Sequence, residues 1–193
     1  MLNRRALVAD ILAGRGETLL VTGLGSPTYD AAAAGDHALN FYLWGAMGSA
    51  AMIGLGLALA QPERRVLVIT GDGEQLMALG ALATIAAERP RNLALLVLDN
   101  EAFGETGRQA GLTGRGVDLA AVAAAAGFAA TLKITDANDT SALVKLLYRT
   151  PGPVLAAAKI SLEPEPLVLP ERDGRYLAQR FRAALLGPAR ATR

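Results

Sequence analysis

The chain has 193 residues, of which 52% are hydrophobic and 19% charged, so it is long enough to bury the core of one domain and its composition excludes intrinsic disorder. The 19 Lys and Arg residues nearly balance the 18 Asp and Glu residues and form no basic run, so a nucleic-acid partner is not expected. The absence of cysteine excludes disulfides, iron–sulfur clusters and thiol catalysis in this chain.

Short apolar runs alternate along the chain with stretches of helical length. The runs that predict strands buried on both faces are 18–22, 65–70, 92–98 and 153–158. Stretches rich in Ala and Leu predict helices at 46–60, 75–88, 118–126 and 138–148. This alternation predicts an α/β fold, in which a parallel sheet is flanked by helices on both faces.

The last part of the chain has a different character. Residues 1–160 are expected to form the folded domain, and residues 161–193 an arm with a C-terminal helix. Three prolines within 161–173 predict extended backbone, and an amphipathic pattern predicts a helix over 175–186. We expect the arm to pack on the domain or on a neighbouring chain.

No segment has the character of a secretory signal or a membrane span. The first ten residues include two arginines, but Asp10 interrupts their apolar run. The longest apolar stretch, 46–60, contains glycines and a serine and is too short to cross a bilayer. We therefore expect a cytoplasmic protein without a membrane partner.

Glycine and acidic residues follow the predicted strand 65–70. Gly71 and Gly73 allow a tight turn, and Asp72 places a carboxylate at the end of the strand. The N–H groups at the start of the following helix can meet an anion. This combination suits a metal ion together with a phosphate, and a plain strand-to-helix turn is the alternative.

Asn100 follows the next predicted strand, 28 positions after Asp72. One helix and one strand fill this spacing, so both side chains return to the same edge of a parallel sheet. Mg²⁺ accepts protein oxygens, phosphate oxygens and water, and Asp72, Asn100 and the carbonyl of Ala102 would supply such ligands. Asn100 alone would indicate a turn, but its occurrence together with Gly71–Gly73 favours a metal site.

The loop after the first predicted strand has two interpretations. Gly25 and Ser26 open a predicted helix and can contact a diphosphate there. Ser26 is equally suited to cap this helix ahead of Pro27. The loop is also the one candidate for a dinucleotide fingerprint, but Thr28 stands where its third glycine would be.

The Gly-Asp-Gly sequence with Asn 28 positions after its Asp resembles the diphosphate-binding (PP) module of thiamine-diphosphate-dependent enzymes, over about residues 15–160. Within this superfamily, the chain most resembles the β subunits of sulfopyruvate decarboxylase and the carboxyl half of phosphonopyruvate decarboxylase. The segments that carry this similarity are 40–42, 45–48, 54–60 and 80–85.

The resemblance implies thiamine diphosphate and Mg²⁺ as cofactors. It implies that Asp72 and Asn100 bind Mg²⁺ through their side chains and Ala102 through its carbonyl oxygen. Gly73 and Glu74 would donate backbone N–H groups to the diphosphate. The implied cofactor-binding residues are Gly25, Ser26, Gly45, Ala46, Met47, Gly71, Asp72, Gly73, Glu74, Asn100, Ala102, Phe103 and Gly104.

Two of these residues are implied to meet the aminopyrimidine ring of the cofactor. The carbonyl of Gly45 would accept a hydrogen bond from the 4′-amino group. Met47 would support the cofactor in its bent shape. Packing against a helix is the alternative role for Met47, because methionine fills gaps in many cores.

Two further residues have no assigned role. His37, the one histidine, precedes the strand that leads to Gly45, where an acid–base role and an inert loop position are both open. Arg108 follows the metal loop, where the resembling decarboxylases have Gln-Pro-Thr and this chain has 109–113 of different sequence. Arg108 would hold an anionic substrate or lie at the surface.

The resemblance implies decarboxylation of a small anionic 2-oxo acid, of the sulfopyruvate or phosphonopyruvate type, to an aldehyde and CO₂. The cofactor accepts the electrons released by loss of CO₂. In this family a glutamate of a second module, PYR, activates the cofactor, and no glutamate of this chain is assigned that role. No catalytic residue is therefore predicted here, and we expect a PYR-domain subunit as partner, in a hetero-oligomer with at least two copies of each chain.

Three alternatives stay open beside this interpretation. They are a carboligase of the same cofactor class, a dinucleotide-binding oxidoreductase domain and a noncatalytic assembly subunit. The identity of the 2-oxo acid, and the choice between decarboxylation and carboligation, depend on residues of the partner as well as on Arg108.

Overall fold

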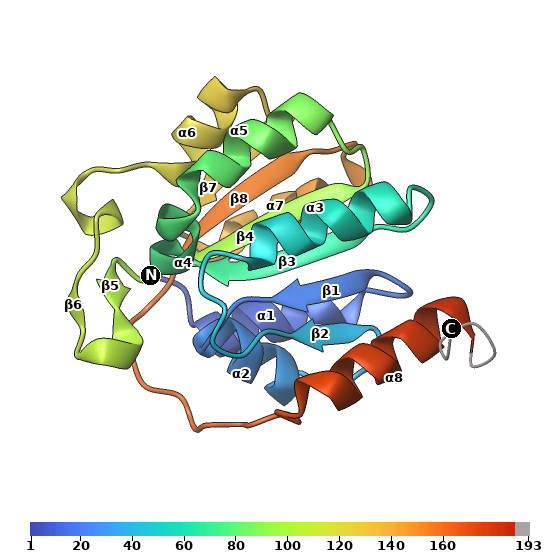
Figure 1. Ribbon diagram of the computed structural model, residues 1–193. Helices are drawn as coiled ribbons and strands as arrows, with labels where there is room; N and C mark the ends of the chain where they lie inside the picture. The colour runs from blue at the N-terminus through green and yellow to red at the C-terminus, as the bar shows by residue number, and fades with distance from the viewer. Residues whose placement is uncertain (188–193) are drawn as a thin grey trace.

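Six parallel strands form the centre of the computed structural model, which describes residues 1–187 (Figure 1). From one edge to the other they are β2 (Asn40–Tyr42), β1 (Leu19–Thr22), β3 (Val66–Gly71), β4 (Leu93–Asp99), β8 (Val154–Lys159) and β7 (Ala130–Ile134). Each neighbouring pair runs parallel. The four strands predicted from apolar runs each lie within a residue of the predicted bounds.

Helices cover both faces of the sheet (Figure 1). One face carries α1 (Arg4–Ala13), α2 (Ser26–Ala33) and α7 (Thr140–Arg149), and the other carries α3 (Ala50–Ala60), α5 (Leu79–Glu88) and α6 (Leu119–Ala126). The short helix α4 (Asp72–Met77) stands at the carboxyl end of β3, and α8 (Gly174–Leu186) lies along β2. The predicted fold class is confirmed.

The strands are continuously apolar because both of their faces are covered. In β3, Val66 and Val68 belong to one core cluster, whereas Leu67 and Ile69 belong to the other. All four side chains are fully buried. The middle of the sheet therefore provides a rigid support for the loops at its carboxyl edge.

A small ribbon follows β4 at this edge. Strand β5 (Ala102–Phe103) pairs antiparallel with β6 (Gln109–Ala110). Short 3₁₀ turns at Gly104–Thr106 and Thr113–Arg115 flank β6, and a third such turn, Ala137–Asp139, leads into α7. The ribbon places residues after Asp99 above the end of the sheet.

Helix α1 and strand β7 were not predicted. The side chain of Asn3 caps α1 by accepting the N–H of Ala6 at 2.8 Å, and the buried face of the helix repeats at helical spacing in Leu7, Val8, Ile11 and Leu12. Strand β7 is an edge strand in which Ile134 alone is fully buried, so its apolar signal is weak.

Two predicted helix starts were wrong. The helix expected at 46–60 begins at Ala50, because Gly45 and Gly48 have positive φ angles of 73° and 89° and hold a loop before it. The helix expected at 75–88 begins three residues earlier and is divided at Ala78 into α4 and α5. The Gln75 side chain donates to the carbonyl of Ala78 at 3.2 Å and so satisfies an acceptor at the break.

The predicted arm is extended, and a helix follows it as expected. Residues 161–173 form no helix or strand, and Trp44 Nε1 donates to the carbonyl of Glu171 at 3.2 Å. Residues 188–193, the end of the predicted arm, lie outside the described part of the chain.

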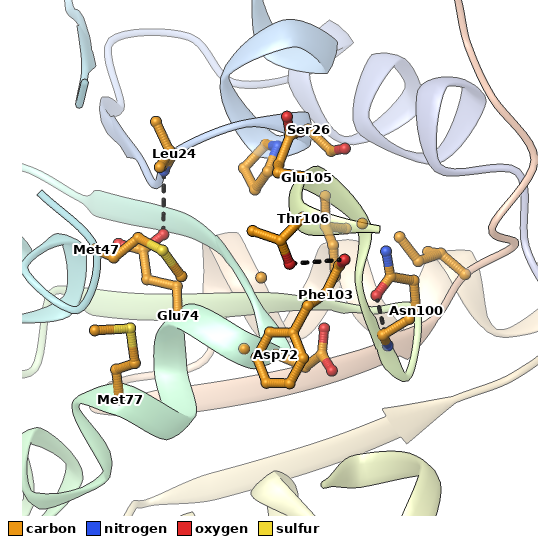
Figure 2. A pocket seen from close by; sticks show the side chains of 17 residues that line it. Leu24, Ser26, Met47, Asp72, Glu74, Met77, Asn100, Phe103, Glu105 and Thr106 are labelled. Carbon is orange, nitrogen blue, oxygen red and sulfur yellow. Dashed lines mark hydrogen bonds between the residues drawn. The ribbon is translucent and has the colours of Figure 1, made fainter. Parts of the chain in front are cut away.

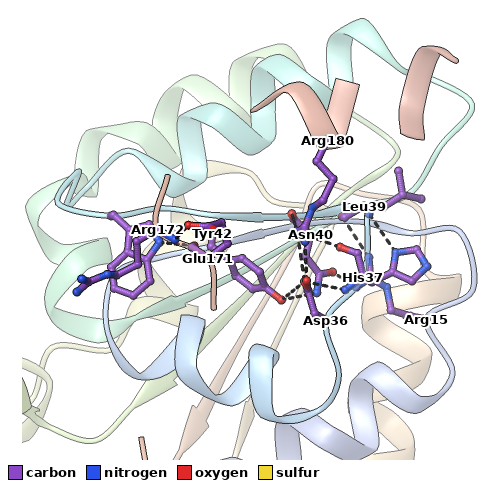
Figure 3. Close-up of polar contacts among 10 residues, drawn as sticks. Arg15, Asp36, His37, Leu39, Asn40, Tyr42, Glu171, Arg172 and Arg180 are labelled. Atoms are coloured by element: carbon purple, nitrogen blue, oxygen red, sulfur yellow. Dashed lines mark hydrogen bonds and ion pairs between the residues drawn. The ribbon is translucent and has the colours of Figure 1, made fainter. Parts of the chain in front are cut away.

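An ion pair, which Figure 3 shows, and an aromatic contact hold α8 on the domain. Arg180 Nη1 lies 2.5 Å from Asp36 Oδ2, and the hydroxyl of Tyr42 donates to the same carboxylate at 2.9 Å. The rings of Phe41 and Phe181 are 5.9 Å apart in an edge-to-face arrangement. The arm and α8 therefore pack on this chain's own domain.

Substitution of two glycines of α3 would test the packing of this helix on the sheet. A Cβ at Gly54 would lie 2.3 Å from Cγ2 of Val68, whereas a Cβ at the exposed Gly56 would meet nothing within 4 Å. We expect Gly54→Ala to lower the free energy of unfolding by about 1–3 kcal/mol through overpacking. Gly56→Ala should raise it by about 0.5–1 kcal/mol, because alanine favours the helix. Urea unfolding measures both, and a Gly54→Ala variant as stable as the wild type would contradict this account of the packing.

Candidate functional site

A cavity of about 390 Å³ opens at the carboxyl ends of β1, β3 and β4 (Figure 2). Strands β2 and β3 lie on opposite sides of β1. In parallel α/β sheets, ligands bind at the carboxyl ends of the strands where the strand order reverses in this way. The predicted residues that line the cavity are Ser26, Met47, Gly71, Asp72, Gly73, Glu74, Asn100, Ala102, Phe103 and Gly104. Gly25, Gly45 and Ala46 belong to adjoining loops and do not line it.

The three predicted metal ligands meet in this cavity. Strands β3 and β4 pair with Gly71 opposite Leu98, so Asp72 and Asn100 lie just beyond the ends of neighbouring strands. Asn100 Oδ1 accepts the N–H of Ala102 at 3.0 Å, and this turn keeps both residues beside the cavity. The juxtaposition expected from the spacing is thus present.

Asp72 is a buried acid without a cationic partner in the described chain. The residue is 2% exposed, and its Oδ2 accepts the hydroxyl of Thr113 at 2.9 Å. Burial raises the pKa of Asp72 and the charge of Asp99 adds to this, whereas the hydrogen bond from Thr113 opposes it. None of the ion pairs within residues 1–187 includes Asp72. Such a carboxylate fits a site for a bound cation.

The donors around the cavity have the chemistry that Mg²⁺ requires. Asp72 provides a carboxylate, Asn100 an amide oxygen and Ala102 a main-chain carbonyl. Within residues 1–187 no group of three or more His, Cys, Asp or Glu side chains is arranged to hold a metal. The oxygen donors of Asp72, Asn100 and Ala102 fit a hard cation that retains phosphate and water ligands, as Mg²⁺ does.

Glu74 of α4 connects two loops beside the cavity, and Figure 2 shows its contact with Leu24. Its carboxylate accepts the N–H of Leu24 at 3.1 Å and that of Gly48 at 3.3 Å, and burial raises its pKa. A Cβ at Gly23 would lie 1.8 Å from Glu74 Oε2, so this close approach needs glycine. The sequence predicted a role for the backbone of Glu74 and did not reveal this role of its side chain.

The two glycines around Asp72 have different roles from those expected. Neither Gly71 nor Gly73 has a positive φ, so the turn itself does not require glycine. A Cβ at Gly73 would instead lie 2.9 Å from the ring of Phe103, which is 37% exposed in the cavity. Gly73 thus allows the ribbon after β4 to close against α4. Nothing lies within 4 Å of the Cβ position of Gly71.

Ser26 is not the cap of α2. The N-cap is Gly25, which has a φ of 77° and no side chain to cap with, and Ser26 is the first helical residue. The hydroxyl group of Ser26 lies at the cavity (Figure 2). The structure therefore favours the ligand-facing interpretation of Ser26 over the capping one.

The two residues without an assigned role lie apart from the main cavity. His37 is exposed, and its Nδ1 accepts the N–H of Leu39 at 3.1 Å (Figure 3). Arg108 has a φ of 61° and lines a second cavity of about 280 Å³, next to the first. The loop position of His37 is therefore favoured over an acid–base role, whereas Arg108 stays near the site.

Several residues of the site were not predicted. Leu24, Glu105 and Thr106 line the cavity from loops and turns, and Met77 lines it from the end of α4. Thr113 contacts Asp72 from a loop 41 positions away, and no spacing in the sequence indicates this. Asp99 stands next to Asn100 in the sequence, at the end of a predicted strand. Its contact with Thr113 could not be predicted, because that contact forms only when the loop folds back onto the strand.

Residues 23–158 match the family model described as "Thiamine pyrophosphate enzyme, C-terminal TPP binding domain". The chain belongs to this family of thiamine-pyrophosphate-binding proteins. The membership follows from the sequence match, and the residues that line the cavity after β1, β3 and β4 lie within the matched region, except for Ile160.

Several relatives are decarboxylases, as the motifs indicated. The chain is 43% identical over 160 residues to the phosphonopyruvate decarboxylase of Streptomyces viridochromogenes, which covers 81% of this chain and 39% of that protein. It is 36% identical over 181 residues to the sulfopyruvate decarboxylase subunit beta of Methanothermobacter thermautotrophicus, covering 94% of each. The resemblance drawn from the motifs is therefore confirmed.

The fold also matches a solved structure. A putative thiamin diphosphate-dependent enzyme from Mycobacterium smegmatis superimposes with a TM-score of 0.70 at 19% identity, over 85% of this chain and 32% of that one. This likeness shows the fold.

Within residues 1–187, every helix is too short or too polar to traverse a lipid bilayer.

Removal of the Glu74 side chain tests its role as a connection between loops. Glu74→Ala leaves the N–H groups of Leu24 and Gly48 without their acceptor, so we expect the free energy of unfolding to fall by about 1–3 kcal/mol. Glu63→Ala, at an exposed position, serves as the control and should stay within about 0.5 kcal/mol of the wild type. Equal urea midpoints for the two variants would refute this role.

Proposed function

We propose that this chain is the cofactor-binding subunit of a thiamine-diphosphate-dependent decarboxylase acting on a small anionic 2-oxo acid. The observation that carries the proposal is the carboxylate of Asp72, which is buried and has no ion pair in the described part of the chain. It lies beside Asn100 and Ala102 in one cavity of a family member. The decarboxylase names of the relatives support the reaction. The dinucleotide-binding alternative has no support from the matched family.

Asp72 and Asn100 would hold Mg²⁺ through their side chains, and Ala102 through its carbonyl oxygen. The N–H groups of Gly73 and Glu74 would bind the diphosphate. When bound, thiamine diphosphate supplies the electron sink that permits loss of CO₂ from a 2-oxo acid. The protein's own contribution here is to position the cofactor and to exclude water with the apolar cavity wall.

Met47 and Gly45 would hold the pyrimidine side of the cofactor. Met47 lines the cavity and is 41% exposed, which supports contact with a ligand over a place in the core. Gly45 has a φ of 73°, a conformation that frees the neighbouring backbone from helix α3. Its carbonyl would accept the 4′-amino group.

A second subunit with a PYR domain would complete the active site, in a hetero-oligomer with at least two copies of each chain. Two glutamates line the cavity: Glu74 is occupied by backbone N–H groups, and Glu105 lies on an exposed turn. The exposed apolar side chains of Met47, Met77 and Phe103 beside the cavity suit coverage by another chain. The similarity to a sulfopyruvate decarboxylase subunit beta extends over 94% of each chain, and this supports the arrangement in two subunits.

The substrate would carry a second anionic group, as sulfopyruvate and phosphonopyruvate do. Arg108 lines the smaller cavity next to the cofactor cavity, together with Ser26 and Asn100, which line both. A guanidinium at this place suits paired hydrogen bonds to a sulfonate or phosphonate. We also propose a cytoplasmic location for the complex.

The metal ligand provides a direct test. Asp72→Ala in the complex with its partner should weaken binding of thiamine diphosphate with Mg²⁺ by at least about 100-fold, since even outer-shell changes at metal sites reduce affinity about 10–100-fold. Calorimetric titration measures the binding, and release of CO₂ from sulfopyruvate and phosphonopyruvate measures activity. Asp10→Ala, exposed on α1, is the control. Unchanged cofactor affinity in Asp72→Ala would refute the proposed site.

The need for a partner has its own test. The purified chain alone should release no CO₂ from either acid, and addition of a PYR-type subunit should restore the reaction. Product analysis with and without an aldehyde acceptor distinguishes decarboxylation from carboligation. Full decarboxylase activity of the chain alone would show that no partner is needed.

A further inference from the structure

A buried hydroxyl lies behind the carboxylate of Asp72. Thr113 is 5% exposed, and its Oγ1 is 2.9 Å from Asp72 Oδ2 and 2.8 Å from Asp99 Oδ1. Thr113 begins the 3₁₀ turn between β6 and α6. The loop that follows the ribbon therefore returns to the proposed metal site.

The backbone of this loop fixes the place of Thr113. The N–H of Gly111 donates to the carbonyl of Glu101 at 2.7 Å, and a Cβ at Gly111 would lie 3.1 Å from that oxygen. The N–H of Arg115 donates to the carbonyl of Leu112 at 2.9 Å and closes the turn. The hydroxyl is thus held by a loop that is itself attached to the end of β4.

Asp99 has a cation to balance its charge. Lys159 Nζ lies 2.8 Å from Asp99 Oδ2 and 2.6 Å from Glu101 Oε1, and strands β4 and β8 pair Asp99 with Lys159. The Lys159 side chain is 10% exposed, so this contact is largely shielded from water. Of the two carboxylates that flank Thr113, Asp99 forms an ion pair, whereas Asp72 forms none within residues 1–187.

The hydroxyl of Thr113 has one proton, so it donates to one carboxylate at a time. Asp72 gains more from this proton than Asp99, which already has Lys159. A hydrogen bond to Oδ2 restricts rotation of the Asp72 carboxylate. Outer-shell hydrogen bonds of this kind orient a ligand and increase its affinity for a metal.

We propose that Thr113 is a positioning residue for the Mg²⁺ site, which orients Asp72 and is itself held in place by the backbone hydrogen bonds of its loop. This inference rests on the proposed function. It assigns a role to Thr113, the last residue of the segment 109–113 that departs in sequence from the resembling decarboxylases.

Thr113→Val removes the hydroxyl and keeps the shape of the side chain. In the complex saturated with thiamine diphosphate, calorimetric titration with Mg²⁺ should show affinity reduced about 10–100-fold. Thr113→Ser retains the hydroxyl and should restore most of this affinity. Excess Mg²⁺ should recover CO₂ release by the Val variant, because the defect lies in binding of the ion. Thr131→Val, on the far edge strand β7, is the matched control.

The outcomes separate the two proposals. If the wild-type complex binds neither Mg²⁺ nor thiamine diphosphate, the proposed function fails. If it binds both and Thr113→Val binds Mg²⁺ equally well, the positioning role is overturned. A loss in the Val variant that neither Ser nor excess Mg²⁺ restores also overturns it, since Thr113 would then serve only to support the loop. Thr113→Ala replaces the Val variant if the latter does not fold.

Discussion

The parallel pairing of β3 with β4 is the constraint on which the site depends. With Gly71 opposite Leu98, the first residues beyond the two strands must meet at one edge of the sheet. The core clusters on both faces fix this register, because a slip by one residue would exchange the two faces of each strand. Apolar packing therefore determines how closely Asp72 and Asn100 approach one another. The same register of β3 and β4 thus determines both which side chains are buried in the core and which residues meet at the carboxyl edge.

The charges at this edge are distributed unequally. Asp99 and Glu101 share Lys159, whereas Asp72 has no ion pair within residues 1–187. Burial of an ion without a partner is unfavourable, and the raised pKa of Asp72 expresses this. A bound cation would remove that penalty, so the proposed affinity for a metal would arise from the same burial. The neighbouring carboxylates do not compete for the ion to the same degree, since Lys159 already neutralises them in part.

The sequence was sufficient to predict the α/β fold, four of the strands and the edge at which the cavity opens. Apolar runs and the spacing between Asp72 and Asn100 carry this information, because they reflect burial and chain direction. Helix α1 and strand β7 were not predicted. The cap of α1 by Asn3 is a weak sequence signal, and β7, as an edge strand, has few buried apolar residues. The side-chain role of Glu74 and the contact of Thr113 depend on loops that fold back in space. Their partners are backbone groups or distant residues, which no local pattern reveals.

The packing of α8 on β2 has a consequence for assembly. The outer strand of a sheet offers free N–H and C=O groups to other chains, and proteins commonly cover or charge such strands. Here Phe181 and Arg180 attach α8 along β2, and on the opposite edge β7 presents Lys133 toward solvent. Growth of the sheet by addition of a strand from a neighbour is thereby opposed at both ends. Association through helices and loops does not require either of the outer strands.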